Sequence, residues 1–453
     1  MKIRVPHTYA LLLALAAVAA AATWLIPAGA YDRVESHGRS VVAPDSFHPV
    51  DASPAGLFDV LLAWPRGLVA TAPIVFYIFI IGGAFTVIGA TGAIDAAIGL
   101  AVRAGRGSGP LILLLVMLAF SLGGATIGMA EETLPFIPAL VVLARRLGYD
   151  ELTGCAVALV GAGAGFSGAF LNPFTIGVGQ EIVGLPLFSG IRYRFVVWTV
   201  ITAIALVWVL RYAARVRVVP ASAATAPGIG AASAHQPVTP RQQLVLLTLA
   251  AGLGLVVAGA MKWDWGLLEL SGLFVGVTVA AGAAGGLGAD ATAERFLEGA
   301  SAIAPGALVV GLARGILVIF DGAHVTDTIL HAMSAVVTGL PAQASIVGIY
   351  AVQVALSYLV PSGSGQAALS LPILAPLADL TGVTRQTAIL AYQFGDGFSN
   401  IFTPTSGYFM AALALARVPY PRWARFMWPL QLLWLAAGLA LLFLAHAIRW
   451  GPF

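Results

Sequence analysis

Charged residues and cysteine are scarce in this sequence. Only 9% of the 453 residues are charged, 59% are hydrophobic, and the mean hydropathy is +0.93. Soluble domains carry about 25% charged residues, so the composition excludes a soluble enzyme, and a formal net charge of +3 excludes a nucleic-acid-binding surface. The single cysteine, Cys155, excludes disulfides, cysteine-based zinc sites and iron–sulfur clusters. An all-α polytopic membrane protein remains.

Glycine and proline, by contrast, are abundant, with 52 Gly and 26 Pro. Within apolar segments they indicate interrupted helices. Stretches long enough to cross about 30 Å of hydrocarbon predict about nine spans, near residues 8–29, 68–90, 153–180, 192–212, 242–261, 266–288, 301–320, 384–412 and 426–448. Two further stretches, 110–147 and 341–378, carry Gly, Ser or Pro at their middle and predict re-entrant hairpins that do not cross.

The first apolar segment follows Lys2 and Arg4 and ends like a signal-peptide cleavage site. Its apolar run is longer than that of a signal peptide, so we expect an uncleaved span with the N-terminus in the cytoplasm. This orientation puts 14 Lys and Arg residues inside and eight outside, as the positive-inside rule requires. Arg192 and Arg194 lie on the unfavoured side.

The two halves of the sequence resemble each other. Ala72-Pro73 matches Ala304-Pro305, and Gly165-Phe166-Ser167 matches Gly397-Phe398-Ser399, both at an offset of 232 residues. Because the extra span at 266–288 reverses the sense of the second half, the pattern predicts an inverted repeat, which is typical of secondary transporters. We expect a first span (1–30), an outer loop with an amphipathic segment (31–67), a first repeat (68–212, hairpin 110–147), a cytoplasmic linker (213–241), linking spans (242–300) and a second repeat (301–453, hairpin 341–378).

Four segments interrupt helices at membrane depth: 123–133, 161–173, 360–368 and 395–407. Freed amides at half-helix N-termini attract carboxylates, and freed carbonyls at C-termini attract cations. Intramembrane acids are costly and are functional candidates, so Asp396 is expected to bind or sense a coupling cation and Glu132 a cation or an amino group. Purely structural roles, such as close helix packing by Gly and Ser, are the alternative. Arg314 either receives a substrate carboxylate or pairs with Asp321 or Asp327.

These segments supply the predicted binding residues. The substrate-binding candidates are Glu132, Asn172, Ser362, Ser364, Gln366, Asn400, Thr403 and Thr405, and the cation-coupling candidates are Asp396, Ser399, Ser167 and Thr133. No Lys or Arg lies within the four segments, which favours a zwitterionic or cationic amino acid over a succinate-like dianion. No catalytic constellation and no Walker motif is present, so we expect neither an enzyme nor ATP-driven transport.

Four motifs resemble those of the YfcC family, a branch of the C4-dicarboxylate anaerobic carrier-like proteins in the ion transporter superfamily. They are Ile26-Pro-Ala-Gly-Ala-Tyr31, Gly128-Met-Ala-Glu-Glu-Thr-Leu-Pro135, Pro361-Ser-Gly-Ser-Gly-Gln-Ala-Ala368 and Phe394-Gly-Asp-Gly-Phe-Ser-Asn-Ile-Phe-Thr-Pro-Thr-Ser-Gly407. The resemblance covers nearly the whole chain. It implies a multi-pass protein of the bacterial inner membrane, a homodimer of scaffold domains, and a mobile transport domain that moves as an elevator. Superfamily sodium sites often contain Ser-Asn-Thr clusters, to which Ser399-Asn400 and Thr403-Pro-Thr-Ser406 are similar.

Together these features predict a secondary transporter of a small carboxylate-bearing solute, an amino acid or a dicarboxylate. Sodium or a proton is the expected coupling ion, and no other metal or cofactor is expected. The expected partners are the solute, the lipid bilayer and a second copy of the chain. The alternatives are an amino-acid or dicarboxylate exchanger without net cation coupling and, more distantly, a channel.

Overall fold

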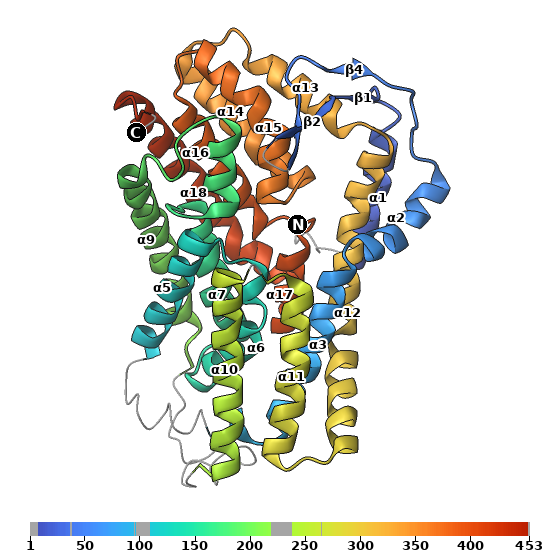
Figure 1. Cartoon of the computed structure of the whole chain (residues 1–453), viewed down its shortest axis with the longest axis vertical. Helices are drawn as coiled ribbons and strands as arrows, with labels where there is room; N and C mark the ends of the chain where they lie inside the picture. The colour runs from blue at the N-terminus through green and yellow to red at the C-terminus, as the bar shows by residue number, and fades with distance from the viewer. Residues whose placement is uncertain are drawn as a thin grey trace.

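The structure, a computed structural model, describes residues 8–36, 39–94, 96, 109–218, 238–263 and 265–451. It is built mainly of helices (Figure 1), namely α1 (Thr8–Ala22), α2 (Leu57–Ala70), α3 (Ala72–Ala90), α5 (Gly109–Ile127), α6 (Phe136–Arg146), α7 (Glu151–Ser167), α8 (Val178–Ile182), α9 (Ile191–Val216), α10 (Pro240–Lys262), α11 (Leu267–Gly285), α12 (Ala289–Gly322), α13 (Thr326–Val337), α14 (Ala342–Leu359), α15 (Gly363–Leu380), α16 (Arg385–Asn400), α17 (Gly407–Ala416) and α18 (Tyr420–Ala447). Within the described ranges, seven helices are long and apolar enough to cross a bilayer: α3, α5, α9, α11, α12, α14 and α18. The prediction of an all-α polytopic membrane protein is confirmed, whereas the count of nine spans stays a prediction.

Helices α1 and α12 have boundaries that differ from those expected. Helix α1 ends at Ala22, earlier than residue 29, and turns over residues 23–25 carry the chain to Ile26, where Pro27 disfavours a helical conformation. Helix α12 begins at Ala289 rather than near 301, since its first turns carry charged residues that hydropathy does not count as part of a span. Most of the expected linker at 213–241 lies outside the described residues.

The outer loop contains β-structure that the sequence did not predict. Strand β1 (Gly29–Ala30) pairs with β4 (His48–Pro49), and β2 (Arg33–Ser36) pairs with β3 (Arg39–Val42), both antiparallel. Strand β3 packs against α15, and Arg33 Nη2 contacts Asp327 Oδ1 on α13 at 2.9 Å. The loop is thereby fixed to the helices beneath it, and Asp327 has a partner other than Arg314.

Helices α2 and α3 pack along the length of α12. Where α2 crosses α12, a Cβ on Gly67 would lie 2.0 Å from the backbone oxygen of Gly311 and 2.7 Å from the backbone nitrogen of Gly315. Neither contact has a flexible side chain that could move away, so glycine is required at Gly67 and the three helices form one tightly packed unit.

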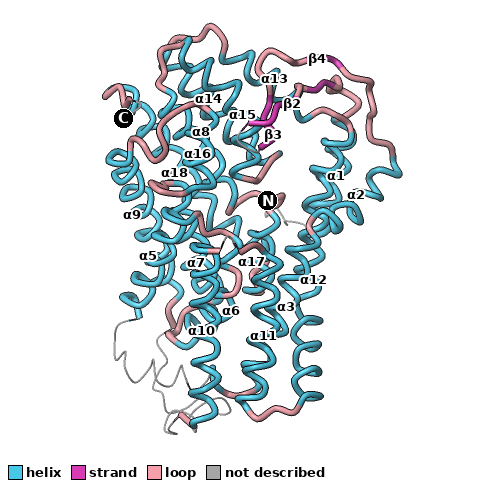
Figure 2. The backbone as a smooth tube through the Cα atoms, in the orientation of Figure 1, coloured by secondary structure: helices cyan, strands magenta, loops and turns pink. Residues whose placement is uncertain are grey.

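The helix pairs predicted as hairpins lie in opposite halves of the molecule. Figure 1 shows α5 and α6 in the lower half and α14 and α15 in the upper half. Helices α7 and α16 contact each other between them and each is followed by an irregular segment, so loop segments gather at the centre of the bundle (Figure 2).

Candidate functional site

The four predicted helix interruptions meet at one cavity, here called the central cavity. It has a volume of about 560 Å³, within the range of small-molecule sites. Its lining comes from both hairpin tips, both broken helices, the α10–α11 loop and the start of α11. It comprises Gly128, Ala130, Glu131, Glu132, Phe166, Phe174, Trp265, Gly266, Leu267, Leu270, Pro361, Ser362, Gly363, Ser364, Asn400 and Tyr408. The predicted residues Glu132, Ser362, Ser364 and Asn400 are therefore brought together.

One wall of the central cavity carries two carboxyl groups. Glu131 and Glu132 lie at the tip of the first hairpin, in the 3₁₀ turn η1 (Glu131–Thr133). Glu132 Oε2 accepts a hydrogen bond from the Ala130 amide at 2.9 Å, which orients its carboxyl group within the tip. Among the described residues, the lining contains no Lys or Arg that could compensate negative charge on this acidic wall.

The opposite hairpin tip presents the N-terminus of an 18-residue helix, α15. Ser362 is its N-cap residue, and no side chain caps the amides of the first turn. Ser362 and Ser364 line the central cavity together with the backbone of Gly363. Free amides and the positive end of the helix dipole favour a carboxylate here, so the cavity has one pole suited to a carboxylate and another suited to a cation.

Asp396 lies directly behind the tip of the second hairpin. Its side chain is fully buried, and neither carboxylate oxygen has a hydrogen-bond partner in the described residues. A Cβ on Gly363 would lie 3.2 Å from Asp396 Oδ2 and 3.0 Å from Thr175 Cγ2, which places both side chains against the tip. A buried carboxylate without partners is stable only when it is protonated or binds a cation.

Hydroxyl groups near Asp396 are also unpaired. Ser399 Oγ, one turn further along α16, and Thr175 Oγ1 are buried without hydrogen-bond partners in the described residues. In the same described part of the chain, no three His, Cys, Asp or Glu side chains form a metal-binding cluster. A cation at Asp396 would therefore take its other ligands from hydroxyl and backbone oxygens.

Several predicted site residues lie outside the lining of the central cavity and hold the loops in place. Gln366 donates to the backbone oxygen and Oε1 of Gln353, both at 2.8 Å, joining the arms of the second hairpin. The hydroxyls of Thr403 and Thr405 lie 2.7 Å apart, and Thr405 also donates to Tyr358 O. The Ser167 and Thr133 hydroxyls donate to the backbone oxygens of Gly163 and Ala130, respectively. Arg314 also lies outside this lining.

Asn172 connects the first broken helix to the first hairpin tip. Its Oδ1 accepts from the amides of Phe174 and Thr175 at 2.8 and 3.3 Å and so begins the π-helical turn η2 (Pro173–Gly177). Gly128 has φ +67°, and a Cβ there would lie 2.5 Å from Asn172 Oδ1. Only glycine suits both this backbone conformation and this close approach.

A buried arginine that the sequence analysis did not identify as functional supports the same region. Arg194, in the first turn of α9, is fully buried and donates to Gln393 Oε1 at 2.7 Å and to Gln386 Oε1 at 2.9 Å. Gln393 in turn donates to the backbone oxygens of Phe166 and Ala169. Arg194 thus orients the glutamine that satisfies carbonyls at the break after α7. In the sequence, the only sign of a special role for Arg194 was its position on the side of the membrane that the positive-inside rule disfavours.

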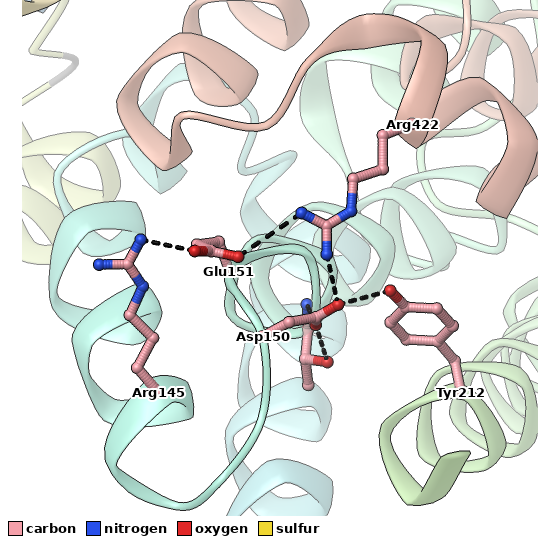
Figure 3. A network of polar contacts seen from close by, with 6 residues as sticks. Arg145, Asp150, Glu151, Tyr212 and Arg422 are labelled. Atoms are coloured by element: carbon pink, nitrogen blue, oxygen red, sulfur yellow. Dashed lines mark hydrogen bonds and ion pairs between the residues drawn. The ribbon is translucent and has the colours of Figure 1, made fainter. Parts of the chain in front are cut away.

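A second polar network lies at the other end of α7, and Figure 3 shows it from close by. Asp150 is the N-cap residue of α7 and accepts from Thr153 N at 2.9 Å, Tyr212 Oη at 2.6 Å and Arg422 Nη2 at 2.8 Å. Burial acts to raise the pKa of Asp150, but these hydrogen bonds and the charge of Arg422 lower it overall. Because Glu151 also contacts Arg145 at 2.6 Å, the network joins α6, α7, α9 and α18.

Comparison with known proteins gives one family and two full-length relatives. The family model described as C4-dicarboxylate anaerobic carrier (DcuC) matches residues 5–447. The Escherichia coli protein YfcC, which its name describes provisionally as a basic amino acid antiporter, is 34% identical and the match covers 93% of this chain and 92% of YfcC. An uncharacterised Haemophilus influenzae protein is 26% identical, with 94% of each chain covered.

A solved transporter structure is also similar over the full length. The YdaH transporter of Alcanivorax borkumensis matches 99% of this chain and 100% of its own, with 18% identity and a TM-score of 0.45.

Proposed function

Because the chain belongs to the C4-dicarboxylate anaerobic carrier family, we propose that it is a secondary active transporter of a small carboxylate-bearing solute, coupled to a cation. The observation that carries this proposal is the central cavity, where two hairpin tips and two broken helices meet. One pole of the cavity suits a carboxylate, and the acidic wall suits a cation. Family membership and the transporter relatives point to a carrier and not to an enzyme.

The preferred solute is an amino acid, zwitterionic or basic. Its carboxylate would bind at the amides and hydroxyls of Ser362, Gly363 and Ser364, and its ammonium group at Glu131 and Glu132. A C4-dicarboxylate would place one carboxylate against the acidic wall, where like charges repel, and no Lys or Arg of the described lining would balance it. The name of the E. coli relative agrees with a basic amino acid, whereas the family description names dicarboxylates.

The coupling ion is a proton or sodium acting at Asp396. Its carboxylate is buried, has no hydrogen-bond partner among the described residues and lies within contact distance of the second hairpin tip. Neutralising this carboxylate would remove the cost of a buried charge and let the tip close on the solute. Ser399 and Thr175 supply hydroxyl oxygens for sodium, so the same location suits either ion.

The architecture we propose is an inverted repeat that works as an elevator. The start of α12 lies 232 residues after the start of α2, and the end of α12 lies 232 residues after the end of α3. The following helices keep the same order in each half, so that α5 corresponds to α14, α6 to α15 and α7 to α16. The hairpins α5–α6 and α14–α15 lie in opposite halves of the molecule (Figure 1). In this proposal the hairpins and broken helices move against α2, α3, α11 and α12.

The remaining assignments follow the same reasoning. We place the protein in the bacterial inner membrane as a homodimer, with the lower end of Figure 1 in the cytoplasm. Exchange of one solute for another without net cation coupling is the second candidate, and the antiporter name of the E. coli relative favours it.

Uptake into proteoliposomes tests the proposal. Competition for labelled lysine at neutral pH should be strong with amino acids and weak with succinate and malate. Stronger inhibition by succinate or malate than by any amino acid would contradict the substrate assignment. Liposomes without internal amino acid distinguish coupling from exchange, because only a coupled transporter accumulates solute there under an imposed sodium or proton gradient.

A further inference from the structure

A second cavity, here called the α6–α17 crevice, lies apart from the central cavity. It has a volume of about 210 Å³ and is lined by residues of α3 and α12 on one side and of α6 and α17 on the other. Helix α17 contacts α12, α3 and α6, and Figure 1 shows α3, α6 and α17 beside the lower part of α12. None of its lining residues lines the central cavity, so the crevice is no extension of the proposed solute site.

Two arginine side chains line one end of the crevice. Arg145, in the last turn of α6, and Arg417, the C-cap residue of α17, both line it, and among the described residues the lining holds no Asp or Glu. Arg145 uses Nη2 to contact Glu151, whereas Arg417 is exposed with its charge at the end of the helix. The two guanidinium groups together favour a group with several anionic oxygens.

Apart from Thr86, the side chains that line the rest of the crevice are apolar. Phe85, Val142, Ile303 and Leu415 line it between the two groups of helices. Its ligand therefore has an anionic head and a hydrocarbon body. In a membrane protein, basic pockets between helices near the bilayer surface match the headgroups of anionic phospholipids.

We propose that the α6–α17 crevice binds an anionic phospholipid, with its phosphate at Arg145 and Arg417 and an acyl chain along the apolar wall. The bound lipid would contact both the unit formed by α3 and α12 and the helices α6 and α17. It would therefore affect how readily these two groups of helices separate.

The conformation of Arg417 provides a clean variant for a test. Its φ is +54°, a left-handed conformation that asparagine adopts more readily than arginine. Arg417→Asn should therefore fold while removing the charge. Arg417→Lys keeps the charge, and Arg215→Asn removes an exposed arginine in the last turn of α9, outside the crevice. Ala302→Trp, at an exposed position in the lining, blocks the crevice without changing charge.

The measurement is thermal stabilisation of the purified full chain in detergent, titrated with phosphatidylglycerol, with phosphatidylcholine of the same acyl chains, and with glycerol 3-phosphate. We expect a saturable effect of phosphatidylglycerol alone. Its half-maximal concentration should rise about tenfold in Arg417→Asn, as expected for losing one charge-assisted hydrogen bond. It should also rise in Ala302→Trp and stay unchanged in Arg215→Asn, with Arg417→Lys close to the parent.

Three results would overturn the proposal. One is an unchanged half-maximal concentration in both Arg417→Asn and Ala302→Trp, and another is equal stabilisation by phosphatidylcholine. The third is saturation by glycerol 3-phosphate at the same concentration as phosphatidylglycerol, which would identify a site for free anions. If Arg417→Asn fails to fold, the half-maximal concentration of phosphatidylglycerol for Ala302→Trp decides whether the proposal holds.

Discussion

Replacing Asp396 by Asn should uncouple transport from the cation gradient. The substitution keeps the shape of a side chain that is fully buried and has no hydrogen-bond partner among the described residues, but it removes the group that gains or loses charge. A tenfold gradient of a monovalent cation supplies about 1.4 kcal/mol per ion, enough for about tenfold accumulation of solute. The parent should reach about this ratio in proteoliposomes, and Asp396→Asn should reach about one while still exchanging solute.

Stability separates this effect from misfolding. Burying an unpaired carboxylate costs several kcal/mol unless it is neutralised, so the amide should leave the melting temperature equal or higher. It should also abolish any stabilisation of the parent by sodium or by acid. Asp290→Asn, an exposed aspartate in the first turn of α12, is the matched control and should accumulate solute like the parent. Cation-driven accumulation that is unchanged in Asp396→Asn would refute the assignment.

Three further predictions concern the solute, the topology and the network of Figure 3. Glu132→Gln should weaken competition by lysine at least about tenfold, which is the effect of losing one charge-assisted hydrogen bond. Inhibition by succinate should become no weaker. An equal loss for both solutes would contradict binding of the ammonium group at the acidic wall. Cysteines placed at Ser364 and at Ala130 should react with impermeant reagents from opposite sides of the membrane. Native Cys155 is buried and should give little background labelling. Labelling of both positions from one side only would contradict the inverted repeat. Asp150→Asn should lower the unfolding free energy at pH 7 by about 1 kcal/mol. Because the folded-state pKa of Asp150 is lowered, its stabilisation is fully present above the unfolded value of about 3.9 and is lost as the pH falls through the folded value. The difference in melting temperature between parent and variant should therefore shrink progressively as the pH falls below about 3.9. A difference that does not change with pH would contradict the role of its charge.

The helical membrane class and the segments that line the central cavity could be predicted from the sequence because both follow from composition and local pattern. Hydropathy marks segments that must leave water, and Gly, Ser and Pro clusters mark where helices break. These signals selected Glu132, Ser362, Ser364 and Asn400, which line one cavity in the structure, and their roles in binding stay predictions.

The supporting residues were not predictable in the same way, because their roles depend on partners distant in sequence. Gln366 occurs in a hairpin-tip motif, yet its amide joins the two arms through Gln353. Trp265 lies in a connection between apolar helices with no motif around it, and it reaches the central cavity only through packing. Arg194 was visible only as an exception to a charge rule, while its contacts with Gln386 and Gln393 arise from the fold.

The position of Trp265 has a consequence for inhibitors. The tryptophan comes from the α10–α11 loop, whereas the acidic wall and the carboxylate pole come from the hairpins. If the hairpins move past α11, a transported molecule must detach from Trp265 before each crossing. A compound with an amino-acid head and an aromatic extension long enough to stack on the indole would hold the fixed and moving parts together. Such a compound would bind more tightly than the natural solute and not be carried, so lengthening a substrate step by step should convert it into a blocker.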